Sequence, residues 1–76
     1  MQLGTRWNVG DRVPVRLPES VVAAVAQVES ELAGVATEGW RWTLTWLEGR
    51  PVLELDDGTV IRMSSAGAVE IVAPSV

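Results

Sequence analysis

The clearest pattern in the chain is a strict alternation of apolar and polar residues between Trp40 and Leu47. A period of two is typical of a β-strand with one buried face, because successive side chains point to opposite sides of a sheet. The apolar side carries three of the four tryptophans of the chain and one leucine: Trp40, Trp42, Leu44 and Trp46. We therefore expect a half-buried strand whose tryptophans contribute to the core.

Three short turns connect this strand to three further apolar runs, and each turn determines a pairing register. A two-residue turn at Glu48-Gly49 keeps apolar residues opposite one another. Loops of three residues do the same at Asp56-Asp57-Gly58 and Ser65-Ala66-Gly67, the first as a type I turn with a G1 bulge at Gly58. The resulting apolar pairs are Leu44 with Leu53, Leu53 with Ile61, Ile61 with Ile71, and Met63 with Val69.

These registers predict a four-stranded antiparallel meander with strands at Trp40–Leu47, Pro51–Leu55, Thr59–Met63 and Ala68–Val72. One face of the meander is apolar enough to form an inner layer. Its expected members are Trp42, Leu44, Trp46, Leu53, Leu55, Ile61, Met63, Val69 and Ile71.

A helix is predicted from Pro18 to Ala33. Proline suits the first helical turn, and Gly34 is placed for a left-handed C-terminal cap. Apolar residues recur at helical spacing and should face the sheet. They are Val21, Val25, Val28 and Leu32, with Val22 and Ala24 widening the stripe.

The first 17 residues form an N-terminal arm with a weaker pattern. Val13, Val15 and Leu17 alternate with polar residues, but Pro14 cannot donate a ladder hydrogen bond. Any strand in the arm is therefore expected to be short or to lie at a sheet edge. We expect Trp7 to pin the arm to the body of the protein, with ligand stacking as the alternative.

Together these elements predict an α+β fold in which one helix packs on a four-stranded antiparallel meander, with an arm able to add a short edge strand. We expect a single domain over residues 1–76: the arm at 1–17, the helix at 18–33 and the meander at 40–72.

Composition narrows the possible chemistry. The chain has no Cys, His, Lys, Tyr or Phe, so it lacks thiolate ligands, disulfides and the commonest general bases. We therefore expect no enzymatic activity, no metal and no other cofactor. The net charge of −4 argues against nucleic acid as a partner, and no apolar run approaches the ~18 residues of a membrane span. We expect a cytoplasmic protein with no membrane partner.

Two acidic motifs have ordinary structural explanations. Glu54, Arg62 and Glu70 recur every eight residues on the polar side of the meander, so a cross-strand ion-pair ladder is favoured over a pair of catalytic carboxylates. Asp56-Asp57-Gly58 lacks the alternating acidic positions of a calcium loop and is interpreted as a turn.

The polar side of the meander also carries three valines, Val52, Val60 and Val72, which we call the valine strip. Either the N-terminal arm or a second subunit is expected to cover this strip, and the free edges of a meander favour the subunit. The candidate interface or ligand-contact residues are Trp7, Trp40, Arg41, Val52, Val60 and Val72.

Residues 42–51 and 55–59, together with the start of the chain from Met1 to Trp7, resemble a group of short uncharacterised actinobacterial proteins. Some of these are automatically labelled "Fe-S oxidoreductase". Iron–sulfur clusters are held by Cys thiolates, with His as the usual substitute, and this chain has neither. The resemblance therefore transfers no functional residue.

Our leading hypothesis is a small non-enzymatic protein–protein interaction or accessory module that binds a copy of itself or another protein, through a sheet edge or the valine strip. The alternative is a small-ligand-binding protein that uses Trp7 or Trp40 with nearby Arg6 or Arg41.

Overall fold

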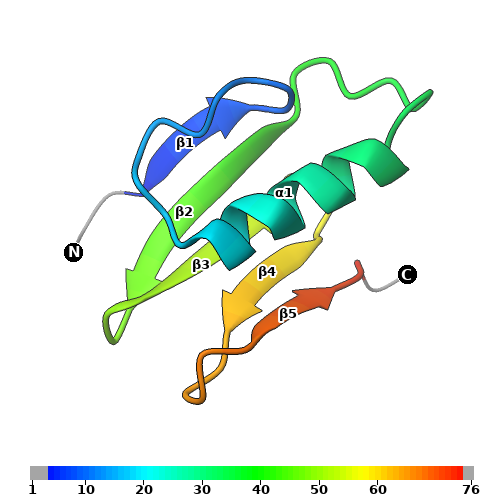
Figure 1. The fold of residues 1–76 in the computed structure, drawn as a ribbon. Coiled ribbons are helices and arrows are strands. Elements are labelled where there is room, and N and C mark those ends of the chain that lie inside the picture. Colours follow the sequence, from blue (N-terminus) through cyan, green and yellow to red (C-terminus); the bar gives the residue numbers. More distant parts are fainter. Residues whose placement is uncertain (1–3, 75–76) are drawn as a thin grey trace.

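Five antiparallel strands form one sheet, and their order in space is their order in the chain (Figure 1). One helix lies across a single face of this sheet, which gives the predicted α+β class. The computed structural model describes residues 4–74. The elements are β1 (Thr5–Asn8), α1 (Glu19–Glu31), β2 (Arg41–Leu47), β3 (Arg50–Leu55), β4 (Val60–Met63) and β5 (Val69–Val72).

The predicted registers of the meander are confirmed. Leu44 pairs with Leu53, Leu53 with Ile61, and Ile61 with Ile71. Glu48 and Gly49 both have positive φ, at 52° and 77°, as a two-residue type I′ hairpin requires. Gly58 has φ 100° and closes the three-residue loop between β3 and β4.

The arm does add an edge strand, but from a different segment than its alternating pattern indicated. β1 comprises Thr5–Asn8 and pairs with β2 so that Trp7 lies opposite Trp42. Gly4 precedes it, and a Cβ there would lie 2.6 Å from the carbonyl oxygen of Leu44, so this close approach requires glycine. Residues 12–17, which lack the ladder donor at Pro14, form the connection to the helix instead.

Helix α1 begins after Pro18, whose backbone carbonyl accepts hydrogen bonds from Val21 and Val22. It ends two residues earlier than predicted, at Glu31, and Gly34 has the expected left-handed conformation at φ 88°. The buried face is narrower than the predicted stripe, because α1 packs against β4 and β5 while Val22 faces a hollow beside the arm. Its buried residues are Val21, Ala24, Val25 and Val28; Leu32 is half-buried and Val22 is exposed.

Most of the predicted inner layer is buried, but Trp46 is not. Its side chain is 46% exposed, because α1 covers β4 and β5 and leaves the end of β2 open. Ile71, on the edge strand β5, is also exposed. The fully buried residues of the sheet are Trp42, Leu44, Leu53, Leu55 and Ile61, with Met63 and Val69 half-buried against them.

The contrast between the two faces of the β2–β3 hairpin leads to a stability prediction. Leu53→Ala should lower the free energy of unfolding by about 2–5 kcal/mol, because it opens a cavity at a fully buried position. Leu47→Ala removes the same atoms where the side chain is 62% exposed and should change it by less than about 0.5 kcal/mol. Urea denaturation followed by tryptophan fluorescence measures both; equal losses would contradict the assigned core.

Candidate functional site

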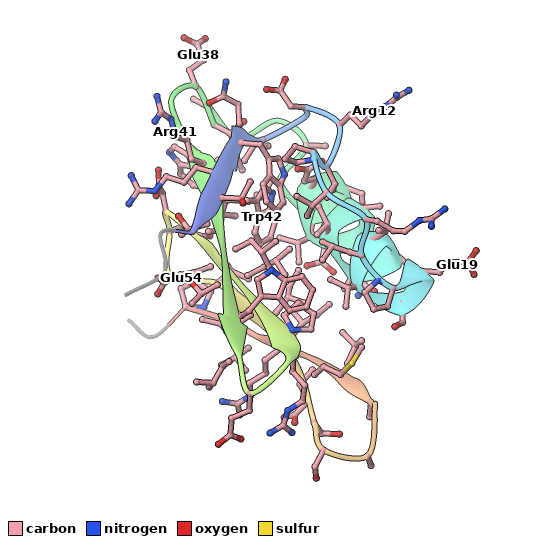
Figure 2. All side chains as sticks on the ribbon, turned by 90° about the vertical axis from the view of Figure 1, so that its left-hand side faces the viewer. Arg12, Glu19, Glu38, Arg41, Trp42 and Glu54 are labelled. Atoms are coloured by element: carbon pink, nitrogen blue, oxygen red, sulfur yellow. The ribbon has the colours of Figure 1, made fainter. Side chains whose placement is uncertain are left out.

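The face of the sheet opposite α1, which we call the outer face, has no helix or loop over it within residues 4–74. In Figure 2 the helix lies on one side of the sheet, whereas Arg41 and Glu54 point to the other side. Val60 pairs directly with Val72, and Val52 lies diagonally beside Val60 on the neighbouring strand. The structure therefore brings the three residues of the valine strip together. The described part of the arm does not cover them.

Charged residues surround the valine strip. Arg62 pairs with Glu70 as predicted, and their side chains approach to 3.6 Å while remaining half-exposed. An exposed pair of this kind contributes at most about 1 kcal/mol, so it favours solubility and register more than stability. Glu54 lies opposite Val60 and forms no salt bridge with a described residue. Of the predicted ion-pair ladder, the Arg62–Glu70 pair is therefore present among the described residues, and Glu54 does not join it.

A hollow of about 330 Å³ lies at the free edge of β1, and we call it the arginine hollow. Two of its arginines come from β1 and the start of β2, and the third comes from the arm. The residues that define it are Arg6, Trp7, Asn8, Asp11, Arg12 and Arg41. Three of the six arginines of the chain therefore line this hollow, together with a single carboxylate, that of Asp11.

The arginines of the hollow differ from those elsewhere in the sheet. Arg50 and Arg62 form salt bridges with Glu48 and Glu70. Among residues 4–74, Arg6, Arg12 and Arg41 form none. Guanidinium groups that carry no carboxylate partner remain available to an external anion.

Trp7, which also lines the arginine hollow, contains a buried polar atom, the indole Nε1. The residue is only 6% exposed, and its indole Nε1 has no hydrogen-bond partner among the described residues. Buried polar atoms nearly always have partners, so this one indicates strain or a missing acceptor. Trp7 pins the arm to the sheet as predicted, and its ring is too deeply buried to stack on a ligand.

The remaining predicted contact residue, Trp40, lies outside the hollow. It is half-buried against the core, and its backbone carbonyl accepts a hydrogen bond from Val9. The prediction therefore named Arg6, Trp7 and Arg41 from the hollow but missed Arg12 and Asn8. Their positions depend on the path of the arm after β1, for which the sequence offers no periodic signal.

A larger hollow, of about 430 Å³, lies between the arm and α1. Its lining is mainly apolar, including Val13, Val15 and Leu17. Four charged residues also line it, namely Asp11, Arg12, Arg16 and Glu29, and Asp11 and Arg12 are shared with the arginine hollow.

Glu29 connects the arm, the helix and the sheet. Its carboxylate accepts a hydrogen bond of 2.9 Å from Nε1 of Trp42 and another of 3.2 Å from the backbone N–H of Gly10. Trp42 is fully buried between the sheet and α1, so its indole N–H needs an acceptor inside the protein. Glu29 therefore positions the arm, and with it one wall of the arginine hollow.

Within the described residues, no helix is long and apolar enough to cross a membrane. No three acidic, His or Cys side chains of residues 4–74 gather as a metal site would require. Comparison of the chain with protein-family models, curated proteins and solved structures finds no match.

The role of Glu29 can be tested with two neighbouring glutamates. Glu29→Ala should lower the free energy of unfolding by about 1–3 kcal/mol, because it leaves the buried Trp42 indole without an acceptor. Glu31→Ala, at an exposed position on the same helix, should change it by less than about 0.5 kcal/mol. Denaturation curves measure both values. If Glu29→Ala were as mild as Glu31→Ala, the hydrogen bond would not hold the arm and helix together.

Proposed function

We propose that the protein is a non-enzymatic interaction module that forms a homodimer through the outer face of its sheet. The observation that carries this proposal is the valine strip, where Val52 and Val60 are half-buried and Val72 is 39% exposed with no described residue above them. Apolar residues gathered on an uncovered sheet face are typical of an interface. A chain of 76 residues also has a small core, which a second subunit would supplement.

The charges around the strip favour a second copy of the same chain as the partner. The outer face carries four arginines and four carboxylates, so its charges balance in a chain whose net charge is −4: Arg6, Arg41, Arg50 and Arg62 against Glu48, Glu54, Asp56 and Glu70. The remaining surface is therefore strongly negative and repels another copy. The outer face is the side on which two copies approach with the least repulsion.

The placement of these charges also suits two-fold symmetry. A two-fold axis parallel to the strands and close to β3 sets β1 of one copy over β5 of the other, as in an aligned sheet sandwich. Arg6 on β1 then lies level with the partner's Val72 on β5, two residues along the strand from the partner's Glu70, and the symmetry repeats the contact. In this arrangement Val60 on β4 packs against threonines of the partner's β2, and Val52 on β3 lies near the axis.

One observation favours the second candidate function, binding of a small ligand. Arg6, Trp7 and Arg41, three of the residues suggested for that role by the sequence, line the same hollow.

A pair of valines tests the dimer. Val52→Glu should raise the dimer dissociation constant by about tenfold or more, because it places a carboxylate on β3 near the axis, beside its own symmetry mate. Val22→Glu is the control, because it makes the same change at an exposed position on α1. Sedimentation velocity over a concentration series measures both. A wild-type chain that stays monomeric at millimolar concentration, or equal effects of the two variants, would contradict the proposal.

The proposed two-fold axis also predicts a substitution that strengthens the dimer. Glu54 on β3 lies near the axis and approaches its own symmetry mate, so Glu54→Gln should strengthen the dimer by about two- to fivefold. Glu31→Gln makes the same charge change on the helix and should have little effect. Sedimentation equilibrium distinguishes the two, and a weaker Glu54→Gln dimer would exclude this axis.

A further inference from the structure

We propose that the arginine hollow at the edge of β1 binds the oxyanion group of a small ligand, a phosphate ester or a carboxylate. Every residue of the hollow belongs to one chain, so the site is complete without a second subunit. The site therefore does not require self-association, and Arg6 and Arg41 also lie on the outer face that the proposed dimer would cover.

The charges of the residues that line the hollow favour a bound anion. Three arginines against one aspartate give the hollow two net positive charges, although the chain as a whole has a net charge of −4. Holding like charges together in a small protein is unfavourable unless an anion relieves the repulsion. Arg16, which also forms no salt bridge with a described residue, lies in the arm outside the hollow.

The guanidinium groups suit an oxyanion chemically. Their planar fork matches the spacing of two oxygens in a carboxylate or phosphate. Arg12 from the arm and Arg41 from β2 line the hollow from opposite sides of β1, and in Figure 2 their side chains point away from each other, so both must turn toward a bound group. Arg6 lies on the outer face, at its β1 edge. The volume of about 330 Å³ falls at the lower end of the range for small-ligand sites.

The free edge of β1 also carries donors that lack acceptors. Val9 donates its N–H to Trp40, and with the observed register this turns the N–H groups of Arg6 and Asn8 away from β2, toward the free edge. An oxyanion supplies acceptors only, which is what this edge of the sheet lacks.

Protection of a free sheet edge by charge is a simpler explanation for some of these residues. It accounts for Arg6, which belongs to β1. It does not account for Arg12, which comes from the arm. Ligand binding explains both arginines.

Nuclear magnetic resonance provides the test, because each of the four tryptophans contributes one indole N–H signal. Inorganic phosphate and succinate are titrated separately into the full chain, with sodium chloride at matched ionic strength as the reference. We expect the Trp7 signal to shift saturably with phosphate, with succinate or with both. The anion whose titration reaches saturation identifies the class of oxyanion that the hollow binds. Arg12→Gln should weaken that binding by about tenfold or more, because it removes charge-assisted hydrogen bonds.

Two further samples make the test decisive. Arg50→Gln makes the same charge change at the start of β3, away from the hollow, and should leave the affinity within about twofold. Val52→Glu should bind at least as tightly as the wild type, since the hollow lies within one chain and a monomer leaves Arg6 uncovered. The proposal is overturned if neither anion gives a saturable shift, if chloride gives the same response, if Arg50→Gln weakens binding as much as Arg12→Gln, or if Val52→Glu abolishes it.

Discussion

The buried indole N–H of Trp42 needs a hydrogen-bond acceptor inside the protein. Meeting this need fixes how the helix and the arm lie on the sheet. A fully buried tryptophan supplies much of the core volume in a chain without Phe or Tyr, but its Nε1 needs an acceptor where water is absent. Glu29 of α1 provides that acceptor and binds the backbone of Gly10 with the same carboxylate. One side chain therefore fixes the helix over the sheet and directs the arm past the edge of β1.

The small size of the protein explains why this arrangement leaves two surfaces open. One helix of 13 residues is wide enough to cover part of one face of a five-stranded sheet. The outer face keeps its valine strip, and the inner face keeps an exposed Trp46 at the end of β2. Because the arm is drawn toward α1 by Glu29, it lines the arginine hollow and leaves the outer face uncovered. Both proposed binding surfaces thus follow from the geometry around Trp42.

The two surfaces were not equally predictable. The valine strip could be derived from the sequence because strand alternation and three turns place Val52, Val60 and Val72 on one side of the sheet. The arginine hollow was only partly foreseen: Arg6, Trp7 and Arg41 were candidates, but Arg12 was not. Its position depends on how the arm leaves β1, and that path is set by contacts of Glu29 and Trp7 with residues far away in the chain.

The meander, its registers, its turns and the helix could be predicted from the sequence. These features depend on local periodicity and on glycines that adopt positive φ. The sequence also determined which residues belong to each face. Only the tertiary structure decided that Thr5–Asn8, and not residues 12–17, forms the edge strand, and that Trp46 remains exposed. Those outcomes depend on where one helix and one arm come to rest on the sheet, through long-range packing and hydrogen bonds that no repeat in the sequence encodes.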